Sequence, residues 1–220
     1  MYKKPLLGLA TLALSIANAP NAQAALINGV TVTTDMGSLD IFTNINNIVN
    51  GSGLPGNTPS LTGNHRSGFT GTYWLSNYNV ITGNITFNLN GTYSLGGFSL
   101  WNSNSENSWG VKGVNVLTST DGSNFTTLAG SPTQFEIEYY FSAESPEQFS
   151  FAPVTASYVR FQVLSNYGYP VLTGLSEVQF DGTPAATAVP EPLTIFGTLA
   201  GLGGGAALKR RLKEIKSKSV

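Results

Sequence analysis

The sequence predicts an all-β domain, an antiparallel sandwich or jelly roll. Three observations indicate it. Apolar and polar residues alternate in runs as long as strands, turn-forming residues separate these runs, and residues 25–181 carry no long apolar stripe of helical period. Alternation of this kind places one face of a strand against a core and the other face in water.

Five runs alternate with a period of two residues, and each is expected to be a half-buried strand. They are residues 85–89, 114–116, 135–141, 159–163 and 178–180. In the third run the aromatic and aliphatic residues are expected to face the core, and Glu136 and Glu138 the solvent. Turns between strands are expected at Asn90-Gly91, Gly96-Gly97, Asp121-Gly122 and Ser145-Pro146.

Residues 43–73 depart from this pattern, because they are rich in Asn, Gly, Ser and Thr and alternate little. A long irregular segment in a compact domain is more often a functional loop, or a loop held by a ligand, than an inert connection. We therefore expect this segment to contribute to the functional site.

Composition and charge exclude several classes of function. The chain of 220 residues has no cysteine and one histidine, which excludes disulfides, thiol catalysis and metal sites built from cysteines or several histidines. Residues 26–188 hold ten acidic against three basic residues, a formal charge of −7. Three scattered cations on an acidic body cannot follow a phosphate backbone, so no nucleic-acid partner is expected.

The N-terminal residues 1–24 have the three parts of a secretory signal peptide. Lys3 and Lys4 precede an apolar run over residues 6–16, and Ala22-Gln23-Ala24 offers a small-x-small cleavage site. Cleavage before Ala25 is expected, which predicts an exported protein whose folded domain spans residues 25–181.

The C-terminus carries a second signal. A linker over residues 182–192 ends in Pro190, Glu191 and Pro192; an apolar run over residues 193–208 and a basic tail over residues 209–220 follow. The apolar run predicts a short membrane helix with its basic end in the cytoplasm.

This three-part order resembles the PEP-CTERM sorting signal of Gram-negative bacteria and cyanobacteria. The resemblance implies that an exosortase-type enzyme cuts near the motif. The chain would then be anchored in the inner membrane only transiently, and would reach the cell surface, the outer envelope or the extracellular matrix.

Three stretches of the body also form an ordered set. Residues 113–125 read as a strand followed by Ser-x-Asp-Gly and an aromatic residue, residues 156–163 contain Ala-x-Tyr-Val-Arg, and residues 174–180 contain Leu-Ser-Glu-Val. With Asn50-Gly51 and Tyr73-Trp74 upstream, they resemble the discoidin, or coagulation-factor C-type, domain of the galactose-binding-like superfamily. The resemblance covers most of residues 40–181. It implies a jelly-roll sandwich that binds sugars, lipid head groups or protein partners, often with a structural calcium ion.

Carried over residue by residue, the family's calcium ligands fall on Asn50, Ser52 and Glu177. Asn50 stands where the family has aspartate, and each lost charge weakens a calcium site. The alternative is that Glu177 caps the loop through backbone N–H groups. The sequence leaves both interpretations open.

No catalytic arrangement is found. His65 is the only candidate base for a serine nucleophile, and no Gly-x-Ser-x-Gly motif exists. The carboxylates give no sign of the pair at defined separation that glycoside hydrolysis requires. The sequence therefore predicts that the protein is not an enzyme.

A sugar site is the better expectation, because aromatic rings pack on the faces of sugar rings while amides, Arg and His bond to hydroxyls. Loops from three parts of the chain hold such residues: His65, Arg66, Trp101, Asn102, Trp109, Tyr167 and Tyr169. The alternative for Trp101 and Trp109 is that they cap the core. The sequence thus predicts a non-catalytic module that binds an extracellular polysaccharide or cell-surface glycan; a structural matrix protein without a sugar site is the alternative.

Overall fold

A computed structural model describes residues 25–66, 71–103, 106–139 and 143–185. The chain divides into two compact units, Met1–Thr183 and Pro184–Val220. The expected signal peptide, the sorting motif at residues 190–192, the apolar run 193–208 and the basic tail lie outside the described residues. Among the described residues, no helix has both the length and the apolar character to span a membrane.

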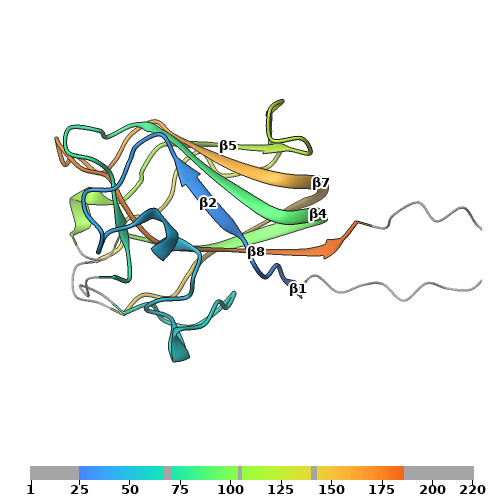
Figure 1. The fold of residues 1–220 in the computed structure, drawn as a ribbon, viewed down its shortest axis with the longest axis horizontal. Helices are drawn as coiled ribbons and strands as arrows, with labels where there is room; N and C mark the ends of the chain where they lie inside the picture. Colours follow the sequence, from blue (N-terminus) through green and yellow to red (C-terminus); the bar gives the residue numbers. More distant parts are fainter. Residues whose placement is uncertain (1–24, 67–70, 104–105, 140–142, 186–220) are drawn as a thin grey trace, which may run out of the picture. The chain divides into compact units, whose positions relative to one another are not determined.

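Within the described residues the regular secondary structure consists of strands and three short 3-10 turns, joined by long loops (Figure 1). The strands are β1 (Ala25–Leu26), β2 (Thr31–Thr34), β3 (Trp74–Leu75), β4 (Gly83–Asn102), β5 (Val114–Ser119), β6 (Thr126–Thr127), β7 (Glu147–Val163) and β8 (Gly174–Pro184). Short 3-10 turns are η1 (Ile45–Ile48), η2 (Pro55–Asn57) and η3 (Asn107–Trp109). Neighbouring strands follow the order β1-β8-β4-β7-β5-β6, with β2 on β4 and β3 on β8.

The two longest strands, β4 and β7, pair antiparallel along most of their length. Gly83 lies opposite Val163 and Leu100 opposite Glu147, and the register is irregular between Asn88 and Tyr93. Asn90, inside this irregular stretch, has a φ of 58°. The ribbon therefore bends sharply where a bulge and a left-handed residue interrupt the ladder.

The two ends of β4 lie near each other, because the ribbon folds back on itself. The first end, Gly83, pairs with the last residue of β7. Asn166, three residues beyond the end of β7, bridges Val111, and the carbonyl of Val111 accepts a hydrogen bond from Asn102 at the end of β4. The two halves of β4 and β7 thus lie in opposite layers of a sandwich.

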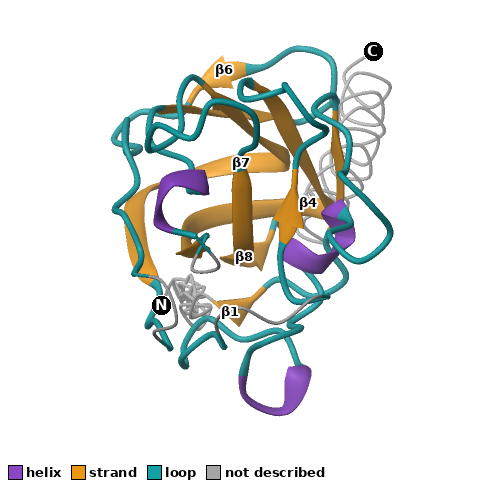
Figure 2. Ribbon diagram, turned by 90° about the vertical axis from the view of Figure 1, so that its left-hand side faces the viewer, coloured by secondary structure: helices purple, strands orange, loops and turns teal. Residues whose placement is uncertain are grey.

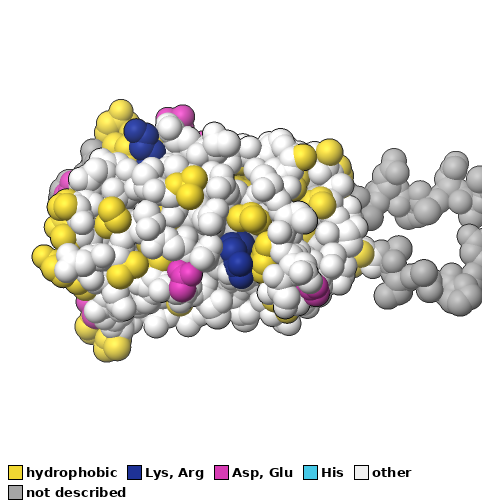
Figure 3. Space-filling view, turned by 90° about the horizontal axis from the view of Figure 1, so that it is seen from above, with side chains coloured by type: hydrophobic (Ala, Val, Ile, Leu, Met, Phe, Trp, Pro, Cys, Tyr) yellow, Lys and Arg dark blue, Asp and Glu magenta, His cyan; other side chains and the backbone are white. Residues whose placement is uncertain are grey.

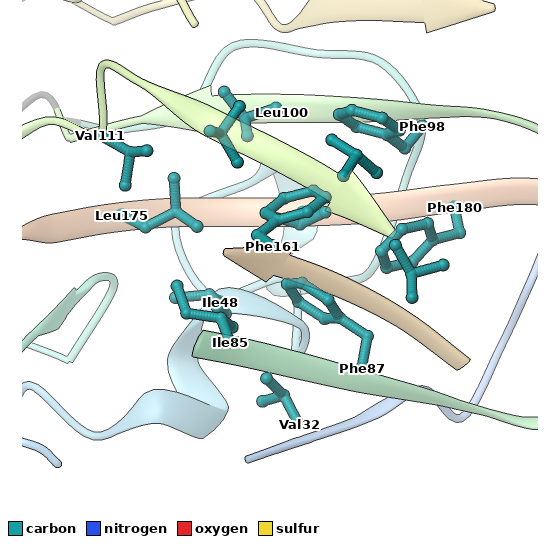
Figure 4. Packing of buried hydrophobic residues seen from close by; sticks show 14 of the residues in the cluster. Val32, Ile48, Ile85, Phe87, Phe98, Leu100, Val111, Phe161, Leu175 and Phe180 are labelled. Atoms are coloured by element: carbon teal, nitrogen blue, oxygen red, sulfur yellow. The ribbon is translucent and has the colours of Figure 1, made fainter. Parts of the chain in front are cut away.

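Aromatic rings from both layers make the core (Figure 4). Phe87 from the first half of β4 packs edge-on against Phe180 of β8, with ring centroids 5.0 Å apart. Phe98 from its second half packs against Phe161 of β7 at 5.3 Å. Rings at this spacing add to the stabilisation from burial itself. The predicted all-β antiparallel sandwich is confirmed.

Four of the five predicted strands are confirmed within β4, β5, β7 and β8. Residues 135–139 are not a strand, and their alternation stops at Ile137. Phe135 is fully buried and Glu136 exposed, as expected, but Glu138 is buried and Tyr139 is 66% exposed. The prediction that Glu138 faces solvent is therefore wrong.

Two of the four predicted turns are wrong. Asp121-Gly122 does separate β5 from β6, and Ser145-Pro146 directly precedes β7, but Asn90-Gly91 and Gly96-Gly97 lie inside β4. A Cβ at Gly97 would lie 2.4 Å from the carbonyl oxygen of Phe149 and 2.5 Å from a carboxylate oxygen of Asp181. Gly97 therefore makes room for neighbouring strands instead of forming a turn.

The irregular segment covers the outer face of the second layer. Ser99 donates to the carbonyl of Leu61 at 2.7 Å, and the Trp101 indole donates to the carbonyl of Gly63 at 3.0 Å. Both donors are buried although they lie on strand β4 away from the core. The segment thus buries a polar sheet face by bonding to it.

Candidate functional site

The described parts of four segments meet at one end of the sandwich, here called the loop end: residues 35–66 and 71–82, residues 103 and 106–113, residues 134–139 and 143–146, and residues 164–173. Isolated bridges join them, at His65–Glu144, Gly110–Gly174, Val111–Asn166 and Gly113–Gln134. Figure 2 looks onto this end, where loops and short helical turns lie in front of the strands. Strands flank three of the segments at both ends, and β7 directly follows the fourth, so the loop end has a rigid base.

Asn166 organises the last of these loops. Its Nδ2 group donates to the carbonyls of Tyr169 and Leu172 at 2.7 and 2.8 Å, and its Oδ1 accepts from the N–H of Gly168 at 2.9 Å. One buried amide thus closes the turn that presents Tyr169. Asn166 was not among the predicted site residues, although Tyr167 and Tyr169 of the same loop were. Its only local signal in the sequence is Gly168, which has a φ of 107°.

Trp109 and Tyr169 come together as an aromatic pair. Their ring centroids are 5.7 Å apart at an interplanar angle of 66°, and both side chains are half-buried. The N–H of Tyr169 donates to the carbonyl of Ser108, which ties the two loops together beside the rings. The structure therefore joins two of the predicted sugar-binding residues on one surface.

Tyr167 lies near this pair but is held differently. Its hydroxyl donates to the carbonyl of Phe135 at 2.6 Å, and the Lys112 ammonium lies 5.5 Å from its ring centroid. Burial raises the pKa of the Tyr167 hydroxyl, so it remains a hydrogen-bond donor at neutral pH. Tyr167 thus fixes the 164–173 loop against the 134–146 segment.

Two buried donors at the loop end lack a hydrogen-bond partner among the described residues. They are the indole N–H of Trp109 and the hydroxyl of Ser103. A buried donor without a partner costs free energy, and in native proteins such groups usually bond to water or a ligand.

Trp101 and Asn102 do not form an exposed surface. Trp101 is fully buried and Asn102 is 1% exposed, so the expectation that they present a ring and an amide to a sugar is wrong. The side chain of Asn102 instead bonds to the backbone of Val111 and to the carbonyl of Glu136. These bonds fix the segment that leads to Trp109.

Glu138 is a buried acid at the loop end, although the alternation had predicted that it faces solvent. It accepts a hydrogen bond of 2.6 Å from the N–H of Asn102, while its second oxygen has no partner among the described residues. Burial raises the pKa of Glu138 to about 9, and the charges of Glu144 and Glu147 act in the same direction. Glu138 is therefore protonated near neutral pH.

His65 and Arg66 belong to another part of the loop end. His65 is fully buried, with its Nε2 2.9 Å from the carbonyl oxygen of Ser52, and its backbone pairs with Glu144. Burial lowers the pKa of His65, so its ring is neutral at pH 7. His65 thus packs the 50–66 loop, and only Arg66 of the two is exposed.

The three predicted calcium ligands do gather around Gly51. Both oxygens of the buried Glu177 carboxyl lie 3.2 Å from the N–H of Gly51, and Gln179 donates to one of them. The side-chain oxygen of Asn50 accepts from the N–H of Ser52 at 2.8 Å. These oxygens bond to N–H donors, which is the loop-capping arrangement.

As arranged, these residues do not fit calcium. The ion takes six to eight oxygen ligands, whereas N–H groups point at this carboxylate. Among the described residues there is no group of three or more acidic or histidine side chains suited to a metal.

Comparison with known proteins identifies the family. The model of the F5/8 type C domain matches residues 47–176, more than half of the chain. Among proteins of curated function, none matches.

Solved structures share the fold. A family 89 glycoside hydrolase from Clostridium perfringens, in complex with PUGNAc, is 21% identical over 76% of this chain, with a TM-score of 0.51. The match spans 15% of that chain. A truncated AlyQ with CBM32 and alginate lyase domains is 16% identical over 74% of this chain and 34% of its own, with a TM-score of 0.50.

One further match is a carbohydrate-binding module. The family 32 carbohydrate-binding module of NanJ from C. perfringens, in complex with galactose, is 12% identical over 72% of this chain and 97% of its own, with a TM-score of 0.48. The family match rests on the sequence itself. The chain therefore belongs to the F5/8 type C, or discoidin, domain family, and its sandwich is of the galactose-binding-like type.

Proposed function

We propose that the chain is a non-catalytic carbohydrate-binding module whose sugar site is the Trp109–Tyr169 pair at the loop end. The single observation that carries the proposal is this pair: two aromatic rings from different loops, 5.7 Å apart, half-buried and fixed by backbone bonds. Sugar rings pack their C–H faces on such surfaces. The unpartnered N–H of Trp109 supports a ligand or water in contact with it.

Two cations of the loop end suit hydroxyl recognition. Lys112 and Arg66 are exposed cations of the loop end, and charged donors make the stronger hydrogen bonds to neutral acceptors. His65, the only histidine, is buried and contacts a backbone carbonyl instead of a serine hydroxyl. This arrangement supports binding without catalysis.

The matched proteins suggest which sugars to test. The C. perfringens hydrolase was determined with GlcNAc-α-1,4-galactose, and the NanJ module with galactose. These ligands were bound to the matched proteins. For this chain, galactose-containing glycans are the first candidates.

We propose export to the cell surface or the extracellular matrix as the setting. The support is in the sequence: the signal-like residues 1–24 and the Pro190-Glu191-Pro192 motif before an apolar run and a basic tail. A surface polysaccharide would then be the natural partner, and an exosortase-type enzyme the processing partner.

The second candidate is a structural matrix protein that makes protein–protein contacts without a sugar site. Exposed apolar side chains favour it: Ile41 is 81% exposed, Tyr78 63% and Phe42 57%. Apolar groups presented on a surface often mark a protein contact.

Binding of the purified chain to a glycan array, with calcium and with chelator, tests the proposal. The variants Trp109→Ala and Tyr169→Ala are each expected to remain folded, with a cooperative melting transition, and to lose selective glycan binding. Tyr78→Ala, an exposed aromatic residue outside the pair, is the matched control and should bind normally.

Selective binding that survives in both folded loop-end variants would contradict the proposed site. Loss of self-association or matrix contacts in Tyr78→Ala, with no glycan bound by the wild type, would instead favour the matrix protein.

A further inference from the structure

The outer face of the first layer carries a row of amide side chains. Asn84 of β4, Gln162 of β7 and Asn115 of β5 lie directly opposite one another in the strand register. Their sequence neighbours Ile85 and Phe161 are buried in the core. Because side chains alternate along a strand, the three amides face away from the core.

The amides are bonded in a way that leaves hydrogen-bonding groups for a ligand. Asn115 donates to the side-chain oxygen of Gln162 at 2.9 Å, and Asn84 donates to Asp35 at 2.7 Å. The side-chain N–H₂ of Gln162 and the side-chain oxygens of Asn84 and Asn115 have no partner among the described residues. The row thus offers donors and acceptors in fixed planes.

A groove lies at one end of this row, with Asn84 and Gln162 but not Asn115 in its lining. Its volume is about 330 Å³, and its lining residues are Thr82, Gly83, Asn84, Gln162, Val163 and Leu164. Leu164 is 50% exposed and gives the groove an apolar edge. This volume falls at the lower end of the range of about 300–1,000 Å³ that is typical of small-molecule sites.

Arg160 lies next to Gln162 on the same face. Its Nε donates to the hydroxyl of Thr86 at 2.9 Å, and its guanidinium lies 3.7 Å from the centroid of the Phe125 ring. Stacking fixes the guanidinium plane. Its outer nitrogen atoms have no partner among the described residues.

The charge of this face suits a neutral ligand. Seen from above in Figure 3, the surface is mostly uncharged, with charged groups only at isolated points. Amides and a guanidinium can each bond two neighbouring hydroxyls at once, and an apolar edge can contact the C–H groups of a sugar ring.

We infer that the amide row, defined as Asn84, Gln162, Asn115 and Arg160, is a second glycan-binding surface that holds a hydroxyl-rich polysaccharide chain. The inference rests on the proposed function, since the loop end would bind one part of the chain and the row another. Leu164 begins the loop that carries Tyr169, so the two surfaces adjoin along the sequence. Two linked contacts on one polymer raise the affinity for the polymer above that for a single sugar.

The test compares galactose with a soluble galactan in titrations of the full chain. The double variant Gln162→Ala with Asn115→Ala removes two exposed amides that bond mainly to each other. It is expected to weaken galactan binding about tenfold or more and to leave galactose binding unchanged. Asn28→Ala removes an exposed amide outside the row and is the matched control.

Galactan affinity that stays at the wild-type value in the folded double variant would overturn the inference. So would an equal loss for galactose, because the row would then not be a separate surface. Trp109→Ala is measured in parallel. If this variant binds both probes normally, the proposed loop-end site is wrong. The double variant still shows whether the amide row binds galactan. A wild-type chain that binds neither galactose nor galactan overturns both.

Discussion

Single buried polar side chains shape the loop end. Asn102, Asn166 and Glu138 each bond to backbone groups that would otherwise lie in loops without partners. Nothing in the sequence near Glu138 distinguishes it from the exposed Glu136, because both fit one alternating run. Its burial depends on where the end of β4 lies, which is a tertiary property.

Replacing Asn166 with alanine removes four hydrogen bonds of a buried side chain. We expect the free energy of unfolding to fall by about 1–3 kcal/mol, because buried carbonyls are left without donors. Tyr169 also loses its support, so glycan binding weakens. Urea unfolding and glycan titration measure the two effects, and Asn64→Ala, an exposed amide with one long bond of 3.4 Å, is the control. Equal stability of Asn166→Ala and the wild type would contradict this role.

Glu138 makes the stability of the protein depend on pH. Its pKa is about 9 in the folded chain against an ordinary value of 4.5, so between these values the folded state holds the extra proton. The stabilisation is complete below about pH 4.5 and is lost as the pH rises through about 9. The free energy of unfolding should therefore fall from pH 5 to pH 9.

The variant Glu138→Gln keeps the acceptor for Asn102 but cannot ionise. Urea unfolding at pH 5, 7 and 9 should show a shallower decline than in the wild type. Some slope remains, because burial also raises the pKa of Glu177. Parallel curves for variant and wild type would show that Glu138 does not titrate in this range.

At the scale of elements, strands were predictable and their interruptions were not. The alternating runs at 85–89 and 159–163 lie within β4 and β7. They were predictable because one face of each run packs on the core and the other does not. Gly96-Gly97 fits a turn equally well by composition. The choice between a turn and a strand depends on Asp181 of β8, which lies against both glycines. Asp181 is distant in sequence, so local composition does not reveal it.

This explanation predicts different outcomes for the two glycines. Gly97→Ala would place its Cβ 2.4 Å from the Phe149 carbonyl, so backbone must move and stability should fall by about 1–3 kcal/mol. Gly96→Ala meets a carboxylate oxygen of Asp181 at 3.3 Å, and this side chain can shift. Its stability should change by less than that of Gly97→Ala in chemical unfolding. If both variants lose the same stability, β4 is constrained by something other than these contacts.

At the scale of the whole molecule, the sandwich and the family could be predicted from sequence, but the exposure of the site could not. Period-two alternation and three ordered motifs were enough for the fold. The sequence around Trp101 and Trp109 does not show which of the two is exposed. Only Trp101 is fully buried, and its indole bonds to Gly63 of the irregular segment. Which aromatic residue a long loop covers depends on its path, which local patterns do not contain.

The loop around Gly51 also bears on calcium binding. Because the Gly51 N–H and the Gln179 amide point at Glu177, we expect the melting temperature of the chain to be equal in calcium and in chelator. Differential scanning calorimetry measures this. A calcium-dependent rise that Glu177→Gln abolishes would show that Asn50, Ser52 and Glu177 do form an ion site.

Tryptophan fluorescence tests the central claim most directly. Trp74 and Trp101 are fully buried, whereas Trp109 is half-buried at the loop end, so a glycan that binds there should alter the emission of Trp109. Titration of the chain with a galactose-containing glycan should give a saturable change that is absent in Trp109→Phe. A change that persists unaltered in Trp109→Phe, or glycan binding with no change in the wild type, would contradict the claim that the Trp109–Tyr169 pair is the sugar site.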